Sequence, residues 1–488
     1  MNKRMVFKTL GNILIFEALI LSLPVLVSIV YREDREIYFL LTMAISFGIG
    51  HLLSNIKTEN KHIYAKEGFI IVALSWIVVS LIGSLPFYFS GEIPCFIDAL
   101  FETVSGFTTT GATILKDIEG LSKSMLFWRG FTHWIGGMGV LVFVLAFLPQ
   151  SEGQNMFLMR AEVPGPVVGK LVSKVKMTAR ILYAIYTVMT VAEIVLLLIG
   201  NMPLYDSILH AFSTAGTGGL SIKNASIAYY DSYYIDMVIA VFMFLFGVNF
   251  NLYYLILLKD FKHVLKSEEL KWYTIIVLGF TAIISINTLG IYDNIRESFR
   301  YSFFQVVSII TTTGFSTTDY NLWPSLSQIL LLLLMIVGSC AGSTAGGIKV
   351  SRAIILVNAA ISSIKKMISP RRVSTIEFEG KSIDKQLLDC VYSYFVVYVL
   401  ILLASMILIS FENLDLVTTI TVVLAALGNV GPGFGEIIGP IGNFSSLSSF
   451  SKLVLCFNML AGRLELFPIV MLCYSFKEFL TVSRKKFK

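Results

Sequence analysis

Two stretches of the sequence combine three consecutive threonines with a glycine. Residues 101–111 read FETVSGFTTTG and residues 304–314 read FQVVSIITTTG, with seven of the eleven positions identical. Threonine can offer a hydroxyl oxygen, and glycine permits backbone conformations that turn successive carbonyl oxygens toward one point. A ring of such oxygens can replace the hydration shell of a monovalent cation. The chemistry that these stretches suggest is cation coordination by uncharged oxygens.

Two further segments fit the same register. A serine stands six residues before the glycine in three segments, which aligns Gly219 with Gly111 and Gly314. Gly216 is a competing choice that breaks the serine alignment, and we reject it. Gly431 marks a more divergent fourth copy, preceded by small or β-branched residues. The residues that we expect to bind the cation are Thr109, Thr110, Gly111, Thr217, Gly218, Gly219, Thr312, Thr313, Gly314, Asn429, Val430 and Gly431.

The elements that position these segments must lie in a membrane. Of 488 residues, 56% are hydrophobic and 14% are charged, whereas a globular domain carries about 25% charged residues. This composition excludes a soluble enzyme, and nothing in it indicates a nucleic-acid partner. Ten apolar runs approach the roughly 20 residues that cross a bilayer. They lie at 10–30, 37–53, 68–89, 126–148, 181–200, 235–258, 272–289, 326–348, 388–410 and 453–474.

Most of the 38 lysines and arginines follow every second run. Because basic residues are retained on the cytoplasmic side, both termini are predicted to be cytoplasmic and the Thr/Gly segments to lie in outward connections. A short helix that enters the membrane and stops at such a segment is typical of a pore helix and filter, since non-helical backbone survives at membrane depth only inside protein or beside water.

The predicted fold is an all-α polytopic membrane protein. Four span, pore-loop and span units form a pseudo-tetramer around one axis, behind two N-terminal spans. The expected parts are the N-terminal addition at 1–66 and the pore units at 67–160, 161–265, 266–375 and 376–488.

A second group of small residues interrupts the eighth run. Residues 338–347 read GSCAGSTAGG, and glycine at this density holds a helix poorly. We predict a mobile gate beneath the cation site, formed by Gly338, Gly342, Gly346 and Gly347; a helix-packing face of small residues is the alternative. A phosphate-binding loop is rejected, because its lysine would stand one residue earlier and be followed by Ser or Thr.

Three ionisable residues in the runs have competing interpretations. An unpaired Arg463 would cost about 3 kcal/mol at membrane depth, so it faces protein or water; a structural ion pair with Glu465 or with another helix is one interpretation. Arg129 and His133 share one helical face. A structural role for them is favoured over a proton relay.

Five motifs together resemble the Trk/Ktr/HKT superfamily of cation transporters. They are TTTGAT at 108–113, TTTGFSTTDY at 311–320, GNVGPG at 428–433, GSCAGSTAGGIK at 338–349 and AGRLE at 461–465. The two N-terminal spans favour the bacterial Trk-type potassium uptake subunits over the shorter Ktr type. The resemblance implies a homodimer in the bacterial inner membrane with one pore per protomer. It also implies that Arg463 lies just below the filter, where its charge would oppose cation passage. K⁺ would be the transported ion, with no cofactor in this chain and a cytosolic nucleotide-binding regulatory subunit of the RCK type as partner.

Other mechanisms and functions remain open at this point. A gated channel and H⁺- or Na⁺-coupled symport both fit the sequence, and the lack of an intramembrane chain of carboxylates favours the channel. A polytopic membrane enzyme, such as a lipid or glycan transferase, is the alternative function. It would need clustered His, Asp or Glu, whereas the five histidines are dispersed.

Overall fold

The chain is almost entirely helical over the part that the structure describes. The computed structural model describes residues 2–58, 64–139, 175–370, 375–435 and 437–475. The only strands within these ranges form the hairpin of β1 (Glu377–Phe378) and β2 (Lys381–Ser382). The α-helices are α1 (Lys3–Ile20), α2 (Ser22–Tyr31), α3 (Glu36–Ser54), α4 (Ala65–Gly83), α5 (Leu85–Phe89), α6 (Phe96–Phe107), α7 (Lys123–Gly137), α10 (Val175–Ile199), α11 (Leu204–Gly216), α12 (Tyr233–Phe246), α13 (Phe250–Leu257), α14 (Phe261–Lys266), α15 (Glu268–Asn287), α16 (Ile295–Ile310), α17 (Ser325–Val337), α18 (Val350–Ile368), α19 (Lys385–Ile409), α20 (Leu416–Leu427) and α21 (Ser449–Arg463).

Long apolar helices form the outside of the molecule. Within the described residues, six helices could cross a membrane by length and composition, or eight if two bent pairs each count as one span. Only 22% of the most apolar stretch of α3, and the same share for α19, is buried inside the protein. Apolar helices exposed to this extent require an apolar solvent, because water would not accommodate them. The predicted all-α polytopic membrane class is confirmed.

Within the described residues, three of the ten predicted spans bend sharply or lose their helix part-way. Residues 235–258 form α12 and α13, which meet at 90°, and residues 453–474 form α21 and the segment Phe467–Ser475, which meet at 117°. The run at 326–348 ends its helix at Val337 and continues without helix to Lys349. In the run at 126–148, α7 ends at Gly137, and the rest of that run, like the predicted unit boundary at 160/161, lies outside the described residues.

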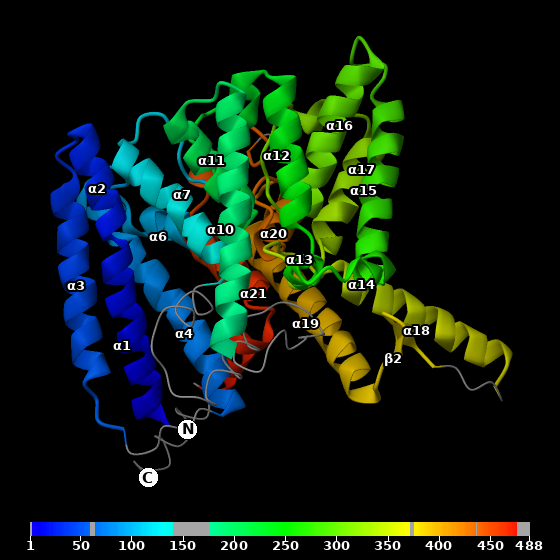
Figure 1. Ribbon diagram of the computed structural model, residues 1–488, viewed down its shortest axis with the longest axis horizontal. Helices are drawn as coiled ribbons and strands as arrows, with labels where there is room; N and C mark the ends of the chain where they lie inside the picture. The colour runs from blue at the N-terminus through cyan, green and yellow to red at the C-terminus, as the bar shows by residue number, and fades with distance from the viewer. Residues whose placement is uncertain (1, 59–63, 140–174, 371–374, 436, 476–488) are drawn as a thin grey trace.

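Eight of the helices contact one another in a closed cycle. The order of neighbours is α6, α7, α11, α12, α16, α17, α20, α21 and again α6. Short helices alternate in this cycle with the helices that follow them in sequence. The short helices are α6, α11, α16 and α20, and each leads into a Thr/Gly or Asn/Gly segment. In Figure 1 the N-terminal helices α1–α3 lie at one side of the molecule and α15–α17 at the other, with α20 and α21 between them.

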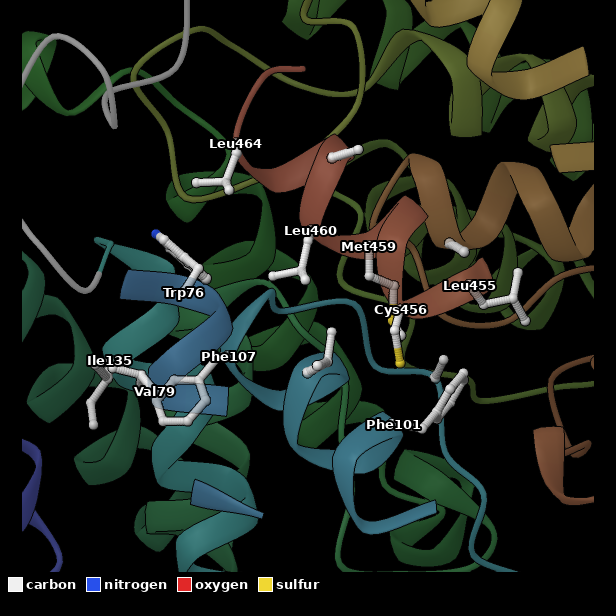
Figure 2. Close-up of a cluster of buried hydrophobic side chains, with 14 of the residues drawn as sticks. Trp76, Val79, Phe101, Phe107, Ile135, Leu455, Cys456, Met459, Leu460 and Leu464 are labelled. Atoms are coloured by element: carbon white, nitrogen blue, oxygen red, sulfur yellow. The ribbon is translucent and has the colours of Figure 1, made fainter. Parts of the chain in front are cut away.

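Large side chains fill the space between α4, α6, α7 and α21. Figure 2 shows this cluster, in which Trp76, Phe101, Phe107 and Met459 are almost completely buried. Since lipid tails are as apolar as these side chains, close van der Waals packing rather than escape from water holds such helices together. The cluster fixes α6 against α21 and so fixes the end of α6, where the first Thr/Gly segment begins.

Candidate functional site

The four short helices end in the same way. At each end one residue adopts the left-handed conformation, with φ of 53° at Thr109, 53° at Thr217, 55° at Thr312 and 55° at Asn429. The next N–H bonds back across the last turn: Thr110 N to Ser105 O is 2.9 Å, for example, and Val430 N to Ala425 O is 2.9 Å. This is a Schellman ending, in which Gly or Asn is usual.

Threonine is an unusual residue for that position. A β-branched side chain is disfavoured at positive φ, yet three of the four helices have threonine there. Backbone strain of this kind persists only where the surrounding structure imposes it, and it is concentrated at functional sites. The four helix ends are therefore held in one shared geometry at a cost.

The glycines that follow bring the four segments together. All four have positive φ: 82° at Gly111, 73° at Gly219, 85° at Gly314 and 93° at Gly431. A β-carbon at Gly111 would lie 2.0 Å from the carbonyl oxygen of Gly218. A β-carbon would likewise lie 2.0 Å from Thr313 O at Gly219, 2.1 Å from Val430 O at Gly314 and 2.5 Å from Thr110 O at Gly431. Each glycine thus touches the carbonyl of another segment, and the contacts close into a ring.

We call the carbonyl oxygens of Thr110, Gly218, Thr313 and Val430, with the four glycines beside them, the glycine ring. A cavity of about 230 Å³ lies against it. Its walls include all four glycines and residues that follow each of them. The helix C-termini direct the negative ends of their dipoles toward the ring. Uncharged oxygens and dipole ends of this sign can attract a cation that has shed water.

The second segment carries glycine where the first and third carry threonine, and His133 explains this difference. The hydroxyls of Thr110 and Thr313 bond to Thr108 and Thr311, each at 2.8 Å. A β-carbon at Gly218 would instead lie 2.4 Å from ring atoms of His133. The imidazole fills the space that the threonine side chain would need.

Polar side chains nine residues before the ring glycines support the chain beyond them. Glu102 accepts hydrogen bonds from Thr113 Oγ1 at 3.0 Å and from the N–H of Ile114 at 3.0 Å. In the second segment His210 Nε2 lies 3.0 Å from Ser221 Oγ, and in the third Gln305 Nε2 donates to Thr317 Oγ1 at 3.4 Å. We did not single out these residues from the sequence, although Glu102 and Gln305 lie inside the aligned repeats.

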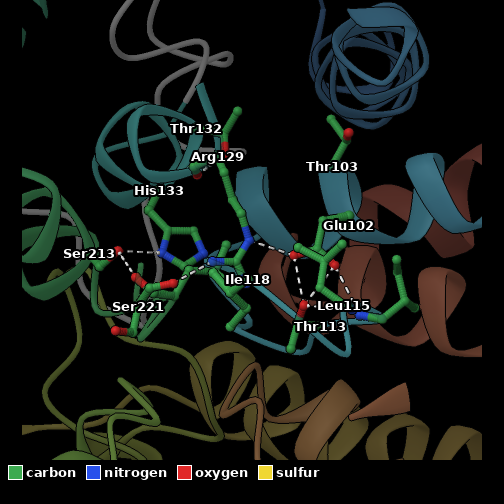
Figure 3. Close-up of polar contacts among 12 residues, drawn as sticks. Glu102, Thr103, Thr113, Leu115, Ile118, Arg129, Thr132, His133, Ser213 and Ser221 are labelled. Carbon is green, nitrogen blue, oxygen red and sulfur yellow. Dashed lines mark hydrogen bonds and ion pairs between the residues drawn. The ribbon is translucent and has the colours of Figure 1, made fainter. Parts of the chain in front are cut away.

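Arg129 and His133 connect the first two segments. Arg129 Nε is 2.6 Å from Glu102 Oε1, and its Nη1 donates to Ser221 O at 2.6 Å. His133 Nδ1 lies 3.3 Å from Ser213 Oγ. Figure 3 shows these side chains between the two segments. This arrangement fits the structural role that the sequence favoured, because Arg129 is held by Glu102 of α6 and by Ser221 beyond the end of α11, and His133 is held by Ser213 of α11.

The segment at residues 338–349 lies against the other side of the ring segments. Gly346 N donates to Thr312 Oγ1 at 2.7 Å, and Thr217 Oγ1 lies 3.4 Å from Thr344 Oγ1. A β-carbon at Gly346 would lie 2.4 Å from Gly428 O. Gly338, Gly342 and Gly347 all have positive φ. We call residues 338–349 the intramembrane loop; because they are not helical, the helix-packing alternative is wrong.

The intramembrane loop and the break between α12 and α13 satisfy each other's backbone groups. Phe250 N donates to Gly342 O at 3.0 Å, and Cys340 N donates to Gly247 O at 3.2 Å. Free N–H and C=O groups cost several kcal/mol each at membrane depth. The two interruptions therefore occur together, since each supplies the hydrogen bonds that the other has lost.

Arg463 is the last residue of α21 and is held by carbonyl oxygens. Its Nη1 donates to Thr344 O at 2.6 Å in the intramembrane loop, and its Nη2 donates to Gly137 O at 2.6 Å at the end of α7. Glu465, the alternative partner, instead forms an ion pair with Arg352. The guanidinium of Arg463 thus lies between the intramembrane loop and the end of α7.

Comparison with known proteins places these features in a family. The model of the TrkH family, described as cation transport protein, matches residues 36–478. The chain belongs to this family. It is 36% identical over 480 residues to a Trk system potassium uptake protein TrkH of Salmonella typhimurium, covering 97% of this chain and 98% of that protein. It is 34% identical to Trk system potassium uptake protein TrkG of Escherichia coli, covering 93% and 94% of the two chains.

A solved structure has the same fold. The crystal structure of the potassium transporter TrkH from Vibrio parahaemolyticus superposes with a TM-score of 0.87 at 32% sequence identity, covering 97% of this chain and 98% of that one. The family resemblance predicted from the five motifs is confirmed. The matched residues of the family model, 36–478, include all four ring segments and the intramembrane loop.

Proposed function

We propose that this chain takes up K⁺ across the cell membrane through the glycine ring. The observation that carries the proposal is the closed set of contacts between each ring glycine and the carbonyl of another segment. K⁺ would be coordinated by these carbonyls and by neighbouring threonine hydroxyls. Family membership and the potassium uptake relatives support the same ion. The residues assigned to K⁺ are the twelve in the four ring segments, from Thr109 to Gly431.

The intramembrane loop is proposed as the gate. Gly338, Gly342, Gly346 and Gly347 provide backbone that can move without the steric cost of a side chain. Arg463 places a positive charge beside this loop, and that charge raises the barrier to a cation on its way through. Ions would then move down their electrochemical gradient, to which a membrane potential contributes about 2.3 kcal/mol per charge per 100 mV.

The assembly and orientation are also proposed. We infer a homodimer in the bacterial inner membrane, with one pore in each protomer and both termini in the cytoplasm. The regulator would be a cytosolic subunit of the RCK type that binds nucleotides. The excess of basic residues in alternate connections supports this orientation, and the name Trk system in the relatives supports a function with several components.

Ion flux into vesicles tests the function. The purified chain in proteoliposomes should take up ⁸⁶Rb⁺, and excess K⁺ should compete with this uptake far better than excess Na⁺. Gly279→Ala is a matched control for glycine substitutions, because a β-carbon there meets no atom within 4 Å. Vesicles that show no uptake above protein-free vesicles would contradict the proposal.

A further inference from the structure

The β1–β2 hairpin forms hydrogen bonds with the start of α15, the helix whose first turn also binds the intramembrane loop. Its strands pair Glu377 with Ser382 and Phe378 with Lys381, which leaves Glu379 and Gly380 in the turn. Figure 1 shows β2 beside α18, toward the end of the molecule at which α1 begins. In the proposed orientation this is the cytoplasmic end.

Glu379 caps α15 although it lies more than a hundred residues further along the chain. Its Oε1 accepts hydrogen bonds from Ser267 Oγ at 2.9 Å and from the N–H of Glu269 at 3.1 Å. The N–H of Glu379 donates to Glu268 Oε2 at 3.1 Å. A carboxylate at a helix N-terminus satisfies free N–H groups and interacts favourably with the helix dipole. The hairpin turn therefore fixes the first turn of α15.

Glu269, in that same first turn, binds both the intramembrane loop and the start of α18. Its side chain is buried, and Oε1 accepts from the N–H of Ala341 at 2.7 Å and from the N–H of Ser351 at 3.1 Å. Hydrogen bonds to a carboxylate are stronger than those between neutral groups. Without these hydrogen bonds the buried carboxylate would be left unsatisfied, which is unfavourable. The positions of the loop and of the first turn of α15 are therefore coupled.

Apolar contacts attach the hairpin to two more elements. Phe378 packs with Ile355 of α18 and Val391 of α19. Helix α18 begins directly after the intramembrane loop. The hairpin thus contacts α15, whose first turn binds the loop, and α18, which follows the loop in sequence.

We propose that the β1–β2 hairpin controls the intramembrane loop, with Glu379 and Glu269 as positioning residues. The inference rests on the proposed function of that loop as the gate. Glu379 orients the first turn of α15. Glu269 in that turn holds the loop at Ala341 and the start of α18 at Ser351, and the loop contacts a ring segment through the hydrogen bond from Gly346 to Thr312. A protein partner that displaced the hairpin on the cytoplasmic face would release the loop from beneath the glycine ring.

Substitution in the hairpin turn tests this coupling. Glu379→Ala removes the acceptor, and we expect basal ⁸⁶Rb⁺ flux of the full chain in proteoliposomes to rise about fivefold or more. K⁺ preference over Na⁺ should stay unchanged, because the ring is untouched. Glu379→Gln retains an acceptor oxygen and should restore most of the wild-type behaviour. Glu377→Ala is the matched control, since its carboxylate is exposed on the same hairpin. Equal flux in wild type, Glu379→Ala and Glu377→Ala would overturn the inference.

A double variant tests whether the two glutamates act through one route. Glu269→Ala should also raise flux, and adding Glu379→Ala should raise it no further, because residues in one hydrogen-bonded chain are not additive. Fully additive increases would overturn the proposed route. If Glu269→Ala does not fold, the comparison of the Glu379 and Glu377 variants decides alone. A wild-type chain without Rb⁺ flux would refute the proposed function, whereas a conducting wild type with unresponsive variants refutes the hairpin inference only.

Discussion

At the scale of single residues, the site depends on positions where a β-carbon has no room. Gly314→Ala places a side chain at φ of 85°, 2.1 Å from Val430 O. The left-handed conformation costs Ala about 1–2 kcal/mol, and the clash moves the carbonyl as well. We expect K⁺ preference over Na⁺ to fall about tenfold, equivalent to roughly 1.4 kcal/mol, in ⁸⁶Rb⁺ competition assays.

Gly91→Ala is the control for that substitution. Gly91 has φ of 74° but no neighbouring atom within 4 Å, so it tests strain without a clash at the ring. Unchanged selectivity in Gly314→Ala, or an equal loss in Gly91→Ala, would argue against the ring.

The close approach of the His133 imidazole to Gly218 gives a second prediction. Gly218→Thr should reduce flux, because the added β-carbon lies 2.4 Å from the imidazole. His133→Ala makes room for it, so the double variant should recover part of the lost flux. Independent, additive losses in the two variants would show that His133 does not occupy the space of the missing threonine.

The buried pair of Arg129 and Glu102 gives a third prediction. Both side chains are buried, and the distance between Arg129 Nε and Glu102 Oε1 is 2.6 Å. Breaking such a pair costs about 3–5 kcal/mol, because it leaves one charge uncompensated. Arg129→Met should therefore lower the denaturation temperature in detergent more than Arg129→Met combined with Glu102→Gln does. The natural glutamine at position 305 shows that the chain tolerates this residue type at the equivalent place.

At the scale of elements, the sequence predicts the apolar helices and the register of the short ones. Serine spacing selects Gly219 over Gly216, and in the structure Gly219 has the φ and the contact of the other ring glycines. We did not predict the bend between α12 and α13, although Gly247, Asn249 and Asn251 interrupt the apolar run there and Asn249 caps α13. The hydrogen bonds that stabilise the bend come from the intramembrane loop, and a partner so distant in sequence cannot be identified from the local pattern.

The same reason explains why Glu269 and Glu102 were missed. Each carboxylate has meaning only through N–H groups of other elements, such as Ala341 for Glu269. Periodicity identifies the face of a helix but not the chain that covers it. Arg463 was found because a charge in an apolar run is conspicuous, whereas its carbonyl partners in α7 and the intramembrane loop were not predictable.

Arg463 provides the prediction for the arrangement of elements. Its guanidinium joins the end of α7 to the intramembrane loop at Thr344. Arg463→Ala removes both the charge beside the ion path and this connection, so ⁸⁶Rb⁺ flux should rise about tenfold for each 1.4 kcal/mol of barrier removed. Arg463→Lys keeps the charge and should give a smaller increase. A lower flux in a well-folded Arg463→Ala variant would show that the residue supports the pore instead of restricting it.

At the scale of the whole molecule, the closed cycle of eight helices lets one chain build a ring that otherwise needs four subunits. The four segments differ in detail, with His133 beside the second and asparagine at the left-handed position of the fourth. A ring made from one chain can vary in this way, because each segment has its own neighbours.

We propose that the carbonyl oxygens of Thr110, Gly218, Thr313 and Val430 hold the transported ion. The most direct test is a crystal structure of the protein in Rb⁺, with anomalous scattering used to locate the ion. We expect an anomalous peak enclosed by these four carbonyls that excess K⁺ removes and an equal excess of Na⁺ does not. A conducting protein whose peaks all lie away from the glycine ring would contradict it.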